Sequence, residues 1–349
     1  PHQYGIAMYF DPFSLPGPQA FIRKLDLLVR DGISIIVENV PQSIAEDLWN
    51  RLNDLKLGGL RSRKSPSYGQ SPIEAIHNTI SCKCALKHMT FEYLYSLEDF
   101  KGNILKFYVE DQDNLIEWVQ YVYDFADHTR RVVQDLDKSA FVLFHTFPLQ
   151  NKMDESPSII HIDGSKIFSK YDLNLYVNMQ TNLEFGSELA RSLYITIVSE
   201  LSGNDLKLCD SLLRYDLREL IDDLYRIAHH VNIQGNEAAW DLAKWKAQLQ
   251  VIFPQLEILR RNLIEQYSDS FTMPHINQRN GRTTRRKLEL ELSDIKYQAN
   301  YYSLPISEEH FRVLGKAVAM RNQIAHYETV SYDDFVTLQI GLNEGSKSE

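Results

Sequence analysis

Short apolar runs rich in β-branched and aromatic residues alternate with helical patterns in the first half of the chain. The helical pattern after the first run begins with an S-x-x-E capping box at Ser43 and Glu46. A long amphipathic helix is predicted over residues 113–131. Strands that alternate with helices usually form parallel sheets covered by those helices. We therefore predict an α/β fold with a mostly parallel sheet, whose strands are expected at residues 33–37, 105–109, 140–147, 159–162 and 173–179.

The second half loses the strand pattern from about residue 183 and shows helical stripes instead. One stripe covers residues 217–228, a second covers 238–252, and a third follows Pro254 and reaches residue 267. A polar loop at 277–287 precedes two more helical patterns. We therefore predict an all-α helical C-terminal part, and three domains in total: an α/β domain at 1–182, a helical connector at 183–235 and a helical domain at 236–349.

Composition and charge narrow the classes of function. The net charge of -10 excludes a general basic coat for nucleic acid but permits local basic patches. There is no run of 18 apolar residues, so no membrane-spanning helix is expected. The first residues show no secretory signal, and we expect a cytoplasmic protein with reduced cysteines. Cys82 and Cys84 lie near His77 and His88, but their spacing matches no standard zinc finger, so we predict no metal site.

The turn after the first strand occupies the place of a phosphate-binding loop. Such a loop needs glycines, a lysine for the phosphates and a hydroxyl for magnesium. The turn at residues 37–43 has neither glycine nor lysine, and Glu38 would repel phosphate. The later strand ends in His145 and Thr146, without a carboxylate that could hold a metal. An active NTPase is therefore disfavoured, and no nucleotide cofactor is expected.

The order of these elements, with a helical segment at 201–224 after the sheet, resembles the ATPase core and lid of the AAA and STAND families. The resemblance covers residues 10–230. It implies a degenerate, inactive ATPase-like fold without a P-loop, used for contact with a protein partner. An unrelated α/β domain is the alternative.

A second group of polar residues follows a helix that is predicted to open near Ser307. Glu308 and Glu309 suit the first turn, where the helix dipole favours negative charge. Its apolar stripe predicts that two polar residues, Arg321 and Asn322, continue the buried face, which is costly unless they meet partners or line a cleft. His326 is expected near the helix end, because Ser331 and Asp334 form a capping box for a new helix.

The six residues from Arg321 to His326 resemble the R-x4-to-6-H signature of HEPN domains, a helical fold of many prokaryotic toxins and antiphage ribonucleases. A polar residue after the arginine, here Asn322, is usual in active members of that family. Tyr327 departs from the small residue that is common at its position. The helices from about residue 236 also suit this fold, so the resemblance covers about a third of the chain.

The resemblance implies metal-independent RNA cleavage in a groove that two paired domains form together. His326 would move a proton to or from the ribose hydroxyls, and Arg321 would stabilise the phosphate charge. Asn322 would orient the site. A homodimer or a larger complex is implied, with no metal or cofactor. The alternative is structural: Arg321 and Asn322 cap carbonyl groups, and the histidine lies in a surface turn.

The polar loop carries a cluster of basic residues that we predict to contact the RNA backbone; they are Arg279, Arg282, Arg285, Arg286 and Lys287. A solvated loop is the alternative interpretation. Taken together, the sequence predicts a HEPN endoribonuclease effector of a toxin or antiphage-defence system, whose N-terminal half senses a trigger or binds a regulatory partner. The alternative is a non-catalytic interaction or regulatory subunit that docks through a degenerate ATPase fold.

Overall fold

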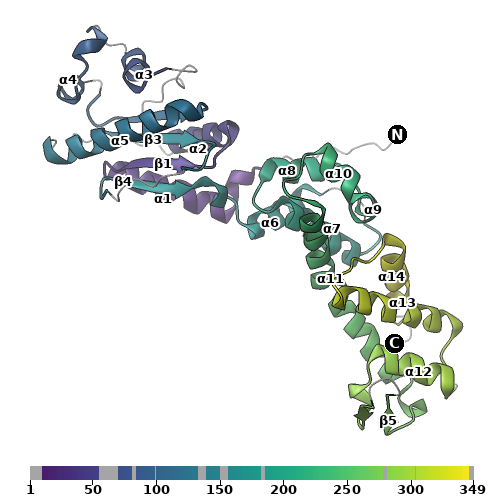
Figure 1. The fold of residues 1–349 in the computed structure, drawn as a ribbon. Coiled ribbons are helices and arrows are strands. Elements are labelled where there is room, and N and C mark those ends of the chain that lie inside the picture. The colour runs from purple at the N-terminus through teal and green to yellow at the C-terminus, as the bar shows by residue number, and fades with distance from the viewer. Residues whose placement is uncertain are drawn as a thin grey trace. The chain divides into compact units, whose positions relative to one another are not determined.

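The computed structural model describes residues 10–54, 70–80, 84–98, 100–132, 139–149, 156–181, 185–277, 281–302 and 304–345. The chain divides into two compact units (Figure 1). Asp11–Asp172 form an α/β unit, and Leu173–Glu349 form a mainly helical unit that also includes Phe10. The predicted fold class is therefore confirmed. The helices of the expected connector, residues 183–235, belong to the same compact unit as the helices that follow them.

A four-stranded parallel sheet forms the centre of the α/β unit, in the order β2-β3-β1-β4. Every residue of β2 and β3 is buried, as expected for strands with helices on both faces. Four of the five predicted strands are thus confirmed within two residues at each end; they are β1 (Ser34–Glu38), β2 (Ile104–Val109), β3 (Ala140–His145) and β4 (Ile159–Asp163).

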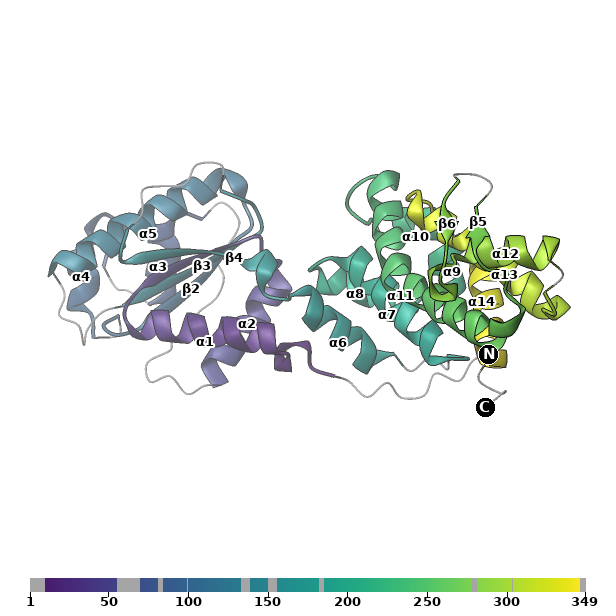
Figure 2. The same cartoon turned by 90° about the horizontal axis from the view of Figure 1, so that it is seen from below.

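Helices cover both faces of this sheet (Figure 2). On one face, α1 (Pro16–Arg30) packs against β1 and against α2 (Gln42–Asp54). On the other face, α5 (Gln112–Val132) packs together with α3 (Pro72–Thr79). Neighbouring residues of β2 mark the two faces, because successive side chains alternate along a strand. Lys106 lies over the ring of Trp49 in α2, whereas Phe107 packs on Trp118 in α5.

The core between α5 and the sheet is rich in aromatic rings. The rings of Phe125 and Phe141 meet edge to face at 4.5 Å, and Phe100 packs on Phe125. Burial of one such side chain contributes about 1.5–3 kcal/mol. Short elements complete the unit: η1 (Pro12–Ser14), η2 (Leu86–His88), α4 (Phe91–Ser96) and η4 (Gly164–Lys166).

Two predictions in the first half are wrong. The helix α2 begins at Gln42, so Ser43 lies inside its first turn and does not cap it. Residues 173–179 are not a strand but part of α6 (Lys170–Gln180). Leu173, Tyr176 and Val177 are buried at helical spacing, whereas Leu175 and Met179, the other two apolar residues of the alternation, are exposed. The Ser169 hydroxyl also accepts the backbone N–H of Asp172, a helix-start signal that outweighs the alternation.

The helical unit is built around the 30-residue helix α11 (Glu237–Gln266), which packs on α7 (Glu188–Ser202), α13 (Glu308–Ala325) and α14 (Tyr332–Gly345). In the described part of this unit, the strands form one short antiparallel pair. The remaining elements are α8 (Leu206–Leu212), α9 (Leu217–Asp222), α10 (Leu224–His230), η5 (Ser268–Ser270), β5 (His275–Ile276), β6 (Thr283–Thr284), η6 (Lys287–Glu289) and α12 (Leu292–Tyr301).

Two helix boundaries differ from the sequence pattern. The stripe at 217–228 is split into α9 and α10 at Asp223, whose backbone leaves the helical region. The two stripes on either side of Pro254 form one continuous helix, α11. Proline breaks isolated helices because it lacks an N–H and crowds the preceding turn. Here the buried residues on both sides of Pro254, such as Ile252 and Leu256, keep the helix continuous by packing.

A glycine sets the close approach of α14 to α13. A Cβ atom at Gly341 would lie 2.3 Å from Cγ1 of Val313 on α13. No side chain fits at that separation, so only glycine allows the two helices to pack as they do. The close contact brings α14 against α13, the helix that carries Arg321 and Asn322.

We predict that Pro254→Ala stabilises the protein. The side chain is exposed, and alanine restores an N–H that can bond to the carbonyl of Gln250. A proline inside a helix costs up to about 3 kcal/mol, so the free energy of unfolding should rise by about 1–3 kcal/mol. Urea denaturation measures it, with Lys246→Ala at an exposed site of the same helix as control. A loss of stability would instead mean that packing around α11 requires a kink at Pro254.

Candidate functional site at the end of α13

The ends of α13 follow the sequence prediction. The Ser307 hydroxyl caps the start by accepting the N–H of His310. His326 is the C-cap residue, and Tyr327 has a positive φ of 62°, the left-handed conformation that commonly ends a helix. The next helix starts at Tyr332, where the Ser331 hydroxyl accepts the N–H of Asp334 at 3.2 Å. His326 therefore lies beside a short turn, as predicted.

Two polar side chains of α11 hold this turn. The fully buried amide of Gln248 donates to the carbonyl of Val330 and accepts its N–H, both at 2.7 Å. One turn earlier on α11, the Trp245 ring N–H donates to the carbonyl of Ile324 at 2.8 Å. The Trp245 ring also packs on Tyr327, with centroids 4.6 Å apart. The backbone on both sides of His326 is thus fixed by α11.

The buried face of α13 is not the one that the sequence pattern predicts. It runs through Val313, Leu314, Ala317, Met320 and Ile324. Arg321 and Asn322 lie next to this stripe and are exposed, so the expected desolvation cost of a buried guanidinium does not arise. His326 is exposed as well, and no group in the described part of the chain forms a hydrogen bond to its ring.

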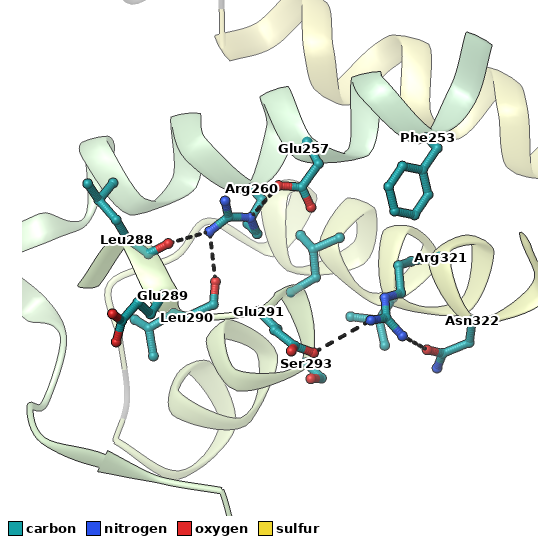
Figure 3. A pocket seen from close by; sticks show the side chains of 12 residues that line it. Phe253, Glu257, Arg260, Leu288, Glu289, Leu290, Glu291, Ser293, Arg321 and Asn322 are labelled. Carbon is teal, nitrogen blue, oxygen red and sulfur yellow. Dashed lines mark hydrogen bonds and ion pairs between the residues drawn. The ribbon is translucent and has the colours of Figure 1, made fainter. Parts of the chain in front are cut away.

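Arg321 and Asn322 line a pocket of about 270 Å³ (Figure 3). The Arg321 guanidinium lies 3.8 Å from the carboxylate of Glu291 and makes a long 3.5 Å contact with the amide oxygen of Asn322. The other oxygen of Glu291 accepts a 2.7 Å hydrogen bond from Arg282. His326 does not line this pocket. The structure thus brings two of the three predicted catalytic residues into one pocket.

The opposite wall of the pocket comes from α11. Phe253, Glu257 and Arg260 are spaced by four and three residues, so they share one face of that helix. Arg260 donates to Glu257 at 2.8 Å and to the carbonyls of Leu288 and Leu290, both at 2.9 Å. Sequence reasoning missed these residues. Their helical spacing was visible, but only the fold places them opposite Arg321.

Most of the predicted RNA-binding cluster is paired with carboxylates. Arg282 pairs with Glu291, Arg286 with Glu289, and Lys287 lies 3.9 Å from Asp269. The hydrogen bond from Arg286 lowers the pKa of Glu289, as expected for a carboxylate held ionised by a cation. Arg285 is exposed and has no ion-pair partner among the residues that the structure describes. Arg279 lies outside the described residues.

The α/β unit has a second candidate region where β1 and β3 end. In open parallel sheets, ligands bind outside the carboxyl ends of the strands, where the strand order reverses. Here the strand ends are hydrogen-bonded to one another. The N–H of Val40 donates to the carbonyl of His145 at 3.0 Å, and the Tyr108 hydroxyl forms a 2.5 Å hydrogen bond with the hydroxyl of Thr146. A Cβ at Gly164 would lie only 1.9 Å from the Val40 side chain. The turn is therefore packed by the protein itself.

His145 at this edge is fully buried. Burial lowers its pKa, because the cationic form loses hydration. The backbone of Phe147 and the Glu38 carboxylate on β1 raise the pKa, and His161 on β4 lowers it. The net direction is downward, so the ring is neutral in the folded protein at neutral pH.

In the described part of the chain, no group of three His, Cys, Asp or Glu side chains is arranged to hold a metal ion. Cys82 lies outside that part. The backbone carbonyl of Cys84 accepts a hydrogen bond from the ring of His77 at 2.8 Å. None of the described helices combines the length and the apolar character that crossing a membrane would require.

We predict that His145 makes the protein less stable in mild acid. The unfolded chain binds a proton near pH 6.5, whereas the folded state binds it only at lower pH, so stability falls as pH drops through that window. His145→Leu should lose less unfolding free energy than wild type between about pH 7.5 and pH 5.5. Urea titrations at both pH values measure this, with the exposed His88→Leu as control. Equal losses in wild type and His145→Leu would refute the assignment.

The site at the end of α13 therefore consists of an exposed arginine, amide and imidazole on a backbone held by α11, beside a pocket with acidic walls. In comparisons with known proteins, the sequence matches no protein-family model and no curated protein.

Proposed function

We propose that the helical unit cleaves RNA without a metal, with Arg321 and His326 as catalytic residues and Asn322 as a positioning residue. One observation carries the proposal: a guanidinium and an imidazole stand in solvent within one helix turn and its cap, on a backbone fixed by Gln248 and Trp245. A fixed backbone lowers the cost of ordering the side chains that act on charge as it develops.

The chemistry follows from the two side chains. The ribose 2′-oxygen attacks the adjacent phosphorus, the bond to the 5′-oxygen breaks, and the products carry a 2′,3′-cyclic phosphate and a 5′-hydroxyl. A base must take the proton of the 2′-hydroxyl, and an acid must give one to the leaving 5′-oxygen. An imidazole with an ordinary pKa of about 6.5 can do either near neutral pH. Arg321 stabilises the charge on the phosphate oxygens.

One chain provides a single R-x4-H motif, whereas the reaction needs both a base and an acid. Two copies that meet at the end of α13 would provide two histidines and two arginines. The surface there is partly apolar: Tyr327 is 72% exposed and Leu242 on α11 is 43% exposed. A partner copy that covers these side chains would gain stability from their burial.

In the cell, the protein would act as a cytoplasmic effector of a toxin or antiphage-defence system. Its α/β unit, an ATPase-like fold without a phosphate-binding loop, would bind a regulatory partner. A second candidate is a non-catalytic interaction protein. It is favoured by the pairing of Arg282, Arg286 and Lys287 with carboxylates, which leaves less positive charge for RNA. RNA cleavage by the purified protein in the presence of a metal chelator distinguishes the two.

His326→Ala should reduce RNA cleavage by about 10²–10⁴-fold, the range typical of positioned proton transfer. Arg321→Ala should reduce it by about 10²–10³-fold, the range typical of losing one donor that stabilises developing charge. Both side chains are exposed, so the melting temperature should not change. Asn322→Ala should show a smaller defect, because an amide can orient the site but cannot carry the proton. Arg312→Ala, an exposed arginine of the same helix that pairs with Glu309, is the matched control. Unchanged cleavage by His326→Ala would rule out the ribonuclease proposal.

Sedimentation at micromolar concentration should give a dimer that forms through the C-terminal helices. Tyr327→Asp should weaken it, because the ring is 72% exposed and a charge there resists burial. Tyr171→Asp is the control, since that ring is 89% exposed and belongs to α6, not to the C-terminal helices. A strict monomer that still cleaves RNA would contradict the two-copy site.

A further inference from the structure

The pocket beside Arg321 joins three kinds of chemistry on adjacent walls. Phe253 presents a half-buried ring on α11. Glu257 stands one turn further along the same face, with 45% of its side chain exposed. Arg321 lies across the pocket on α13, with 44% of its side chain exposed. Figure 3 shows these side chains around one space, with Phe253 and Arg321 on facing helices.

Glu257 is the carboxylate that is available to a ligand. One of its oxygens accepts the 2.8 Å hydrogen bond from Arg260, which fixes the side chain, and the other takes no part in that bond (Figure 3). Arg260 donates through Nε to this carboxylate and through Nη1 to two backbone carbonyls, and only 15% of its side chain is exposed. Glu291 instead lies between two arginines. It accepts a hydrogen bond from Arg282, and its other oxygen faces the guanidinium of Arg321. The pocket therefore offers a carboxylate fixed by Arg260 and, across from it, the more exposed cation of Arg321.

These groups fit a nucleotide better than other small molecules. A flat base can stack on Phe253, as unstacked bases do on aromatic side chains in single-stranded RNA recognition. The phosphate of the same nucleotide can meet Arg321, which binds phosphate oxygens through its planar fork. The pocket volume of about 270 Å³ lies just below the range of about 300–1,000 Å³ typical of drug-sized ligands, so it suits one base.

The fixed carboxylate selects among the four bases. An ionised carboxylate only accepts hydrogen bonds. Guanine presents two adjacent donors on its Watson–Crick edge, N1–H and N2–H, and can give both to one carboxylate. Adenine and cytosine offer one donor beside an acceptor, and uracil places its single donor between two carbonyl oxygens. A carboxylate in this pocket therefore favours guanine.

We infer that the pocket binds a guanine base of single-stranded RNA, with Phe253 stacking on the base, Glu257 accepting from its Watson–Crick edge and Arg321 on its phosphate. Phe253 and Glu257 are then residues that determine the base specificity. The consequence for cleavage next to guanosine rests on the proposed function, whereas the binding of guanine nucleotides does not.

Binding is measured first, by calorimetric titration of the full chain with the 5′-monophosphates of guanosine, adenosine, cytidine and uridine. The guanosine nucleotide should bind at least about ten-fold more tightly than the others, which corresponds to about 1.4 kcal/mol. Glu257→Gln should abolish this preference, because an amide offers one donor and one acceptor. Phe253→Leu should weaken all four nucleotides.

Glu265→Gln, an exposed glutamate of the same helix outside the pocket, should bind like wild type. His326→Ala should also keep the guanosine preference, because His326 does not line the pocket. Melting temperatures separate a lost preference from a lost fold, since Glu257→Gln also removes the partner of Arg260. Equal affinity for all four nucleotides in wild type, or an unchanged preference in a folded Glu257→Gln, would overturn the inference.

Cleavage is mapped second, on an unstructured RNA that contains all four bases equally. Cuts next to guanosine that become evenly distributed in Glu257→Gln support the specificity. Cuts distributed evenly in wild type overturn it while leaving the ribonuclease proposal intact. Guanosine-selective binding without any cleavage has the opposite meaning: the pocket assignment stands and the ribonuclease proposal fails.

Discussion

The paired hydrogen bonds between Gln248 and Val330 fix the part of the molecule that carries the candidate site. They satisfy a fully buried amide and a backbone N–H and carbonyl at once. Leaving such a buried group without its partner costs about 1–3 kcal/mol, so the turn between α13 and α14 has one favoured position. Trp245 adds a third bond to the last turn of α13. The orientation of Arg321 and His326 follows from these contacts with α11.

The same helix shapes the pocket three turns further on. Arg260 of α11 binds the carbonyls of Leu288 and Leu290 and so fixes the chain that leads to Glu291. Glu291 in turn lies between Arg282 and Arg321. A single rigid element therefore positions the backbone around His326 and the acidic wall opposite Arg321. In the proposed reaction, an incoming phosphate competes with Glu291 for the guanidinium.

The α/β unit has a different character. Its parallel sheet is covered by helices, and the turn after β1 is packed against the protein's own groups. The hydrogen bonds of Val40 and Tyr108 connect the residues that follow β1 to those at the end of β3.

Local patterns in the sequence determined the parallel sheet, the start of α13 at Ser307 and the position of His326 at its end, because these depend on alternation and capping within a few residues. Tertiary packing decided the rest. Alternating apolar residues at 173–179 form a helix, and Pro254 lies inside one, because burial against other helices outweighs local preference. Arg321 is exposed because α13 turns Met320 and Ile324 inward, and its place beside Phe253, Glu257 and Glu291 exists only where distant segments meet.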